Sequence, residues 1–205
     1  MIKNIIFDWS GVINDSTERQ LFICNKIFKE FGAKEISLEE MKENWEQPHM
    51  LFYNKYLPNL TPEEEESAFK RIILECSSSK AYAGIIELLK NFKEKGVKMV
   101  ILSSDLPETL MPEITSFNLE NIFIDVIAHV YDKLEGINRL IERNNFKKEE
   151  TIFIGDSNHE IEVGKIVGVK TGAVTWGFCP EEKLKALKPD FLINNLEELK
   201  TAILE

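Results

Sequence analysis

The opening stretch of the chain constrains its fold more than any other, because it has the pattern of a buried strand ending in a carboxylate. Ile5, Ile6 and Phe7 are continuously apolar, as in strands buried on both faces of a parallel sheet. Asp8 follows directly, and Gly11 comes soon after. The carboxyl ends of such strands border the crevice where open α/β sheets bind ligands. Asp8 is therefore a candidate for chemistry, with a simple strand-ending Asx turn as the alternative at this point.

The part of the chain from residue 79 onward alternates between amphipathic helices and apolar strands. Helices are predicted from 85 to Gly96, around 110–114 and from Lys133 onward, and strands at 99–102, 123–127, 151–154, 172–175 and 191–193. Alternation of this length predicts right-handed crossovers and a parallel sheet covered on both faces.

Residues 16–78 interrupt this pattern with a purely helical block. One helix is predicted over 21–31, and capping boxes at Ser37 and Thr61 open two more. We therefore expect an α/β core formed by 1–15 and 79–205, with a helical cap at 16–78. The polar break at 46–50 is either a substrate-facing loop or a plain connection between helices.

Composition excludes several classes of function. The net charge of −10 argues against nucleic acid or an anionic membrane as partner, and no apolar run reaches the roughly 18 residues of a membrane span. The start of the chain lacks the pattern of an export signal, and Cys24, Cys76 and Cys179 are too far apart for a metal cluster. We expect a cytoplasmic protein with reduced cysteines. A small phosphorylated substrate remains compatible with the net negative charge, because a metal ion and one lysine can make the electrostatic potential of the binding site positive.

Four polar side chains gather at one edge of the predicted sheet. Asp8, Ser103 and Asp156 each follow a predicted strand, and Lys133 opens a crossover helix. Two neighbouring carboxylates are best held by a divalent cation, and hard oxygen ligands suit Mg²⁺. A hydroxyl and an ammonium group beside them can donate hydrogen bonds to phosphate oxygens and so form a phosphate-binding site. Aspartate is also an established covalent nucleophile in phosphoryl transfer.

With these residues in place, the sequence resembles the haloacid dehalogenase-like hydrolase superfamily, in the branch with a helical cap after the first motif. The resemblance spans nearly the whole chain and rests on four motifs, which are Ile6-Phe7-Asp8-Trp9-Ser10-Gly11-Val12, Val100-Ile101-Leu102-Ser103-Ser104, the isolated Lys133, and Ile154-Gly155-Asp156-Ser157-Asn158-His159-Glu160. It implies an α/β fold with a Rossmann-like parallel sheet core and an inserted helical cap domain. It also implies a phosphatase-class hydrolase.

The resemblance assigns a role to each motif residue. Asp8 would attack phosphorus, and Asp8, Asp156 and the backbone carbonyl of Ser10 would bind Mg²⁺. Ser103 would bind a phosphoryl oxygen, or Ser104 would face the pocket in its place. Lys133 would neutralise charge on the nucleophile and the phosphate. Glu160 would orient a metal-bound water without binding the metal itself, whereas Asp105 is interpreted as a helix N-cap.

Ser10 departs from the family pattern. Most phosphatases of this family carry an aspartate there, which protonates the leaving alcohol and then activates water. A serine cannot do this near neutral pH, and losing general acid–base catalysis costs about 10²–10⁴-fold. On this basis Ser10→Asp should accelerate alkyl phosphate hydrolysis. If Ser10→Asp does not raise the rate, His49 or Glu46 in the cap loop would be the first candidates for the proton donor.

Three functions fit this sequence. The first is a Mg²⁺-dependent phosphohydrolase that is slow or selective for leaving groups needing little protonation. The second is a phosphonoacetaldehyde-hydrolase-like enzyme that cleaves a C–P bond, suggested by Trp9, although that chemistry needs a cap lysine and the 46–50 loop has none. The third is a non-catalytic protein that retains a phosphate site. The substrate itself is not encoded in any of these motifs.

Overall fold

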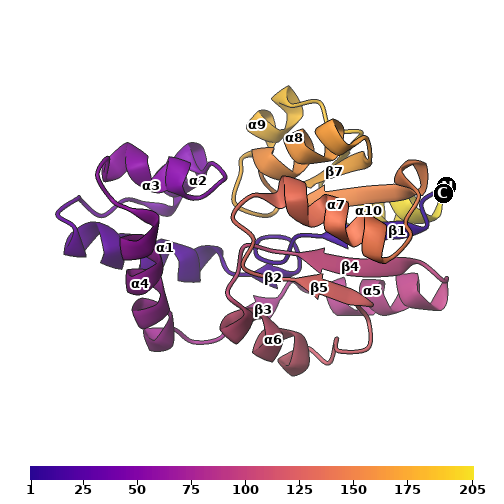
Figure 1. The fold of residues 1–205 in the computed structure, drawn as a ribbon, viewed down its shortest axis with the longest axis horizontal. Coiled ribbons are helices and arrows are strands. Elements are labelled where there is room, and N and C mark those ends of the chain that lie inside the picture. The colour runs from indigo at the N-terminus through magenta and orange to yellow at the C-terminus, as the bar shows by residue number, and fades with distance from the viewer.

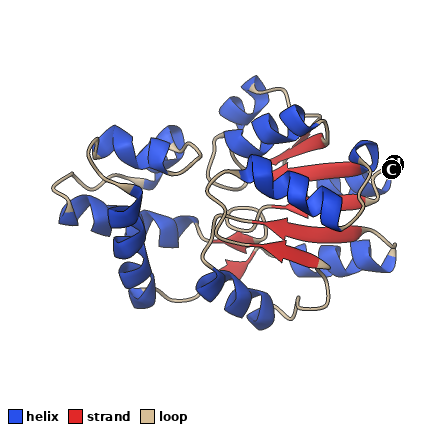
Figure 2. Cartoon of the chain, viewed as in Figure 1, coloured by secondary structure: helices blue, strands red, loops and turns tan.

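A computed structural model describes residues 1–205 and shows one six-stranded sheet with helices on both faces (Figures 1 and 2). The strand order is β5-β4-β1-β6-β7-β8, and all neighbours are parallel. The strands are β1 (Asn4–Phe7), β4 (Lys98–Leu102), β5 (Asp125–Ile127), β6 (Thr151–Gly155), β7 (Lys170–Val174) and β8 (Phe191–Ile193). This confirms the expected α/β class with a Rossmann-like core.

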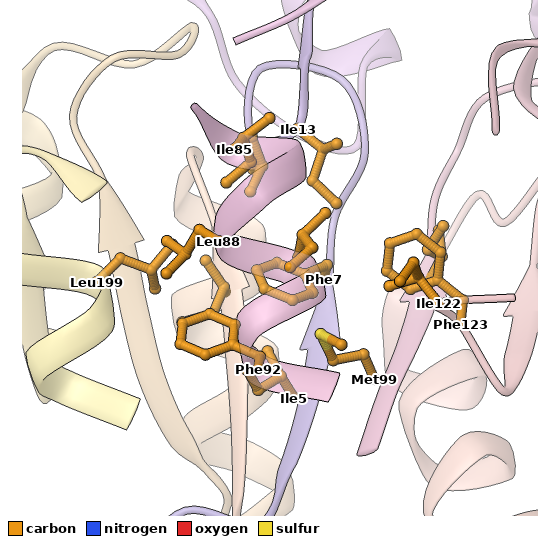
Figure 3. Packing of buried hydrophobic residues seen from close by; sticks show 14 of the residues in the cluster. Ile5, Phe7, Ile13, Ile85, Leu88, Phe92, Met99, Ile122, Phe123 and Leu199 are labelled. Carbon is orange, nitrogen blue, oxygen red and sulfur yellow. The ribbon is translucent and has the colours of Figure 1, made fainter. Parts of the chain in front are cut away.

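Alternating side chains of the strands divide the core into two layers. Ile5 and Phe7 pack with α5 (Ile85–Glu94), α6 (Pro107–Ser116) and α10 (Leu196–Leu204). Figure 3 shows these two residues among side chains from α5 and from Leu199 on α10. Ile6 points to the other face, toward α7 (Lys133–Arg143) and α8 (Asn158–Val167). Because β1 is covered on both faces, its run of apolar residues is required by the fold.

Four α-helices form a separate group to one side of the sheet, with their own apolar cluster (Figure 1). They are α1 (Thr17–Glu30), α2 (Leu38–Asn44), α3 (Met50–Tyr56) and α4 (Pro62–Ile72), followed by the 3₁₀ turn η1 (Ile73–Glu75). Thr61 forms the predicted capping box with Glu64, whereas Ser37 shows only the bond from the Glu40 amide. The sequence prediction missed α3, because no side-chain cap marks its start at His49.

A short antiparallel ribbon joins this helical group to the sheet. It consists of β2 (Asn14–Asp15) and β3 (Lys80–Ala81), and each is too short to leave an apolar pattern in the sequence. The remaining elements are the helix α9 (Glu181–Ala186) and the 3₁₀ turn η2 (Lys148–Glu150). None of the helices combines the length and apolar character needed to cross a bilayer. The cysteines form no disulfide.

Candidate active site

The site lies at the carboxyl ends of three adjacent strands, where the strand order reverses. Phe7 of β1 pairs with Ile101 of β4 on one side and Ile154 of β6 on the other. The chain runs outward from β1 to β4 and β5, then crosses back to β6 on the other side of β1 and runs outward to β7 and β8. A reversal of this kind opens a crevice at the sheet edge. Asp8 and Asp156 therefore come to the same edge, and both are almost fully buried.

Lys133 is the cation of the site. It is the first residue of α7, and its ammonium lies 2.8 Å from Asp8 Oδ2 and 2.5 Å from Glu160 Oε1. The side chain is fully enclosed, with 0% exposure. Burial alone would lower the pKa of Lys133, but Asp8 and Glu160 outweigh it and raise the pKa. The ammonium is therefore held charged against the candidate nucleophile.

Burial raises the pKa of both carboxyl groups that follow the strands, Asp8 and Asp156. The pKa of Asp8 is raised to about 7, mainly by burial and further by the Glu160 and Asp105 charges, with Lys133 opposing. Burial likewise raises the pKa of Asp156, and the charges of Glu160 and Asp8 add to it. These shifts mean that the carboxylates repel one another and are poorly solvated, a situation that a divalent cation would relieve.

A metal ion fits the donor set at this edge. Asp8, Asp156 and Glu160 bring carboxylate oxygens within 4.8 Å of one another, and Lys133 is the one ammonium among them. Buried hard oxygen ligands with an excess of negative charge suit Mg²⁺. Both oxygens of Glu160 are already bonded, one to Lys133 and the other to Ser157. Both Asp8 oxygens are contacted as well, Oδ1 by the Trp9 amide and Oδ2 by Lys133. The assignment of Asp8 and Asp156 as ligands, with Glu160 as a supporting group, therefore stays a prediction from the motifs.

Two glycines allow the backbone to close tightly around Asp156. A Cβ at Gly11 would lie 2.1 Å from Asp156 Oδ2, and one at Gly177 would lie 2.0 Å from the same atom. Gly11 also has a φ of +80°, which residues with side chains rarely adopt. The Phe178 amide donates a hydrogen bond to Asp156 Oδ2 at 2.6 Å. The carboxylate is thus fixed by backbone that has no room for a side chain.

The structure places a carboxylate next to Ser10. Ser10 Oγ donates to Asp105 Oδ2 at 2.8 Å, and Ser103 Oγ donates to the same oxygen at 3.1 Å. The interpretation of Asp105 as an N-cap was wrong, because Leu106 holds that position and has no side-chain cap. Asp105 is the functional candidate that the sequence prediction missed. Its adjacency to Ser103 was visible, but its contact with Ser10 spans 95 residues.

A cavity of about 280 Å³ connects these groups to the helical block. Asp8, Ser10 and Asp105 line it from the sheet side, together with both Ser103 and Ser104. The 46–50 loop contributes Gln47 and His49, and so it faces the cavity. Glu46 does not line it and instead pairs with Lys55 at 2.8 Å. Lys133, Asp156 and Glu160 lie behind the lining, enclosed in protein.

Trp9 points away from the cavity. Its indole is fully buried, stacks on Phe117 with ring centroids 5.6 Å apart, and donates to Glu113 Oε2 at 2.7 Å. The side chain thus serves the core of the sheet domain. No lysine lines the cavity. Trp9 therefore gives no support to imine-based C–P chemistry, and the required amine is missing from the lining.

The profile of the family described as "Haloacid dehalogenase-like hydrolase" matches residues 5–174. The chain therefore belongs to the haloacid dehalogenase-like hydrolases, which confirms the family and the phosphatase-class hydrolase expected from the motifs. The matched range contains Asp8, Ser10, Ser103, Asp105, Lys133, Asp156 and Glu160, whereas Gly177 and Phe178 lie just beyond it.

Curated relatives carry phosphatase names. The chain is 26% identical over 212 residues to the pyrophosphatase PpaX of Listeria monocytogenes, covering 97% of this chain and 94% of that protein. It is 23% identical over 208 residues to a phosphoglycolate phosphatase of Synechococcus elongatus, covering 98% and 97%. A pyrophosphatase PpaX of Halalkalibacterium halodurans is 31% identical over 123 residues, and this match covers 58% of this chain and 57% of that protein.

Solved structures share the fold. A predicted phosphatase from Clostridium acetobutylicum superposes with a TM-score of 0.89 at 21% identity, covering 100% of this chain and 99% of that one. A haloacid dehalogenase-like hydrolase from Bacteroides fragilis gives a TM-score of 0.87 at 17% identity, covering 97% and 100%. At these identities the likeness shows the architecture alone.

Proposed function

We propose that this protein is a Mg²⁺-dependent phosphohydrolase that acts on a small phosphorylated metabolite through an aspartyl phosphate at Asp8. The observation that carries the proposal is the buried Lys133 ammonium, which lies 2.8 Å from Asp8 Oδ2. Asp8 itself lines the cavity together with Ser103 and Ser104. The phosphatase names of the relatives agree with the proposal. The cavity is small for a ligand site, which favours a small substrate.

The reaction divides into two displacements at phosphorus. Asp8 forms a bond to phosphorus as the bond to the leaving oxygen breaks, and the leaving group takes up a proton. Water then attacks the aspartyl phosphate, which releases inorganic phosphate and restores the Asp8 carboxylate. Lys133 favours the ionised form of Asp8 against the effect of burial and offsets its charge, and the hydroxyls of Ser103 and Ser104 are placed to bind phosphoryl oxygens.

Mg²⁺ would be held by Asp8, Asp156 and the carbonyl of Ser10, with Glu160 supporting. When bound, it supplies positive charge that stabilises the developing phosphoryl charge. Asp156 is fixed for this role by the Phe178 amide and by the absence of side chains at Gly11 and Gly177.

Asp105 is the group best placed to exchange a proton with the leaving oxygen and with the attacking water. Its carboxylate is bonded to Ser10, the position where the family usually has an aspartate, and it lines the cavity. The carboxylate absent from the loop after β1 is thus supplied by the loop after β4. This restores general acid–base catalysis, which is worth about 10²–10⁴-fold.

The test is release of inorganic phosphate from p-nitrophenyl phosphate and alkyl phosphates, with Mg²⁺ and with excess EDTA. The proposal predicts turnover with Mg²⁺ and its loss with EDTA. Melting temperature measured alongside should rise with Mg²⁺, because a ligand that binds the folded state stabilises it. Phosphate binding without turnover would instead support the non-catalytic alternative.

A further inference from the structure

The part of the cavity farthest from the sheet shows which leaving groups the site can accept. Its roof comes from the helical block, through Gln20 on α1, Tyr53 on α3 and Glu65 on α4, together with His49. A phosphate seated against Asp8 would direct the rest of the substrate toward this roof. The roof residues therefore determine the chemistry of the leaving group.

The cavity wall has two imidazoles, and each of them faces a glutamate: His49 Nε2 lies 3.3 Å from Glu65 Oε2, and His129 Nε2 lies 3.6 Å from Glu66 Oε1. No lysine or arginine lines the cavity, and Lys133 lies enclosed between Asp8 and Glu160. Arg19, at the start of the helical block, is held by Glu113 at 2.5 Å and does not line the cavity. A second negative group on the substrate would thus meet no guanidinium or ammonium that could bind it.

Glu65 is the buried carboxylate among the roof residues. The residue is 5% exposed, it lines the cavity, and its Oε2 lies 3.3 Å from His49 Nε2. A buried carboxylate needs hydrogen-bond donors, and an ionised one can only accept. Burial first, then the Cys24 and Glu65 charges, raise the pKa of Tyr53, so its hydroxyl keeps its proton. Gln20 adds an amide that can both donate and accept.

We propose that the leaving group of the substrate carries hydroxyl or ammonium donors and no negative charge, with Glu65 as the residue that selects it. This rests on the phosphohydrolase function proposed above and narrows its substrate class to phosphomonoesters of polyols or amino alcohols. The named activities of the relatives involve anionic leaving groups, phosphate from pyrophosphate and glycolate from phosphoglycolate. This chain discriminates against both.

Three phosphomonoesters with the same two-carbon chain isolate the effect of the end group. They are 2-hydroxyethyl phosphate, phosphoethanolamine and 2-phosphoglycolate, which end in a hydroxyl, an ammonium and a carboxylate. We expect kcat/KM with Mg²⁺ to be at least about tenfold higher for each of the first two than for the third. Equal values, or a preference for 2-phosphoglycolate or pyrophosphate, would overturn the proposal.

Glu65→Gln removes the charge while keeping the shape, and it should lower the hydroxyethyl-to-glycolate ratio of kcat/KM at least about tenfold. Glu63→Gln makes the same change on the exposed first turn of α4 and should leave the ratio unchanged. An unchanged ratio in Glu65→Gln, with the melting temperature retained, contradicts the role of Glu65.

A failure of the phosphohydrolase proposal can be distinguished from a failure of the leaving-group proposal. If no ester, including p-nitrophenyl phosphate, releases phosphate, the phosphohydrolase proposal fails. The inert wild-type protein then allows calorimetric titration of the same three esters without turnover. Tighter Kd values for the hydroxyl and ammonium esters would still support this inference, and equal or reversed values would overturn it.

Discussion

The hydroxyl of Ser10 lies 2.8 Å from the carboxylate of Asp105. This bond joins the loop after β1 to the loop after β4 and brings a carboxylate to the position where this chain has Ser10 in place of the family's usual aspartate. The sequence alone suggested that Ser10→Asp would supply a missing group. With Asp105 already there, that substitution would place two carboxylates against each other, and a gain in rate is no longer expected.

The first prediction concerns Asp105. Asp105→Asn should lower kcat/KM for alkyl phosphates about 10²–10⁴-fold, because the leaving alkoxide then lacks a proton donor. The loss should be small for nitrophenyl phosphate, whose leaving oxygen is weakly basic. The measurement is phosphate release across substrates of graded leaving-group pKa. A loss equal for all leaving groups would mean that Asp105 only supports the loop.

A swap variant gives the matched control for this prediction. Asp105→Ser alone should be as impaired as Asp105→Asn, and adding Ser10→Asp returns a carboxylate to the same contact from the opposite loop. We expect the double variant to recover at least about tenfold over Asp105→Ser on alkyl phosphates. No recovery, with an intact melting temperature, would show that the carboxylate must come from the β4 side.

The strand-end part of the site could be predicted from sequence, whereas the Ser10 to Asp105 contact could not. Asp8 and Asp156 follow runs of buried strand residues, and parallel strands bring their carboxyl ends to one edge whatever the loops do. The position of Asp105 depends on how two loops meet in space. Its sequence neighbours favoured a local capping role, whereas in the fold its carboxylate accepts a hydrogen bond from the distant Ser10.

The helical block shows the same distinction. The α4 start was predictable because Thr61 and Glu64 satisfy each other's backbone locally. The fit of the block against the sheet was not. It depends on Trp45 stacking on Phe178 with ring centroids 4.7 Å apart, and on hydrogen bonds that Asn158 and Gln47 exchange across 111 residues.

The second prediction tests the close packing around Asp156. Gly11→Ala places a methyl group against the carboxylate, so the rise in melting temperature with Mg²⁺ should disappear. Gly32→Ala is the matched control, because Gly32 also has a positive φ but nothing lies within 4 Å of its added Cβ. It should cost only the backbone strain, about 1–2 kcal/mol, and keep the full Mg²⁺ response. Equal Mg²⁺ responses in both variants would argue against Asp156 as a ligand.

The third prediction concerns the junction between the helical block and the sheet. Buried Glu113 accepts hydrogen bonds from Trp9, Asn14 and Arg19, the last at the start of α1. Glu113→Gln leaves Arg19 without its counter-charge and should destabilise folding by about 2–3 kcal/mol, somewhat less than outright loss of a buried pair. Urea unfolding measures this, with the exposed Glu120→Gln as control, expected within about 0.5 kcal/mol of wild type. A loss of unfolding free energy in Glu113→Gln as small as that of the control would refute the stabilising role of Glu113 at this junction.

The most direct test of covalent catalysis at Asp8 is the rate of Mg²⁺-dependent phosphate release by the Asp8→Asn variant. An amide is a poor nucleophile and a poor metal ligand, and the side chain keeps its shape beside Lys133. If Asp8 forms the aspartyl phosphate, kcat should fall by a factor on the order of 10³ to 10⁶, while urea unfolding shows a folded protein. A purified, folded variant that retains a rate within about tenfold of wild type would contradict covalent catalysis at Asp8.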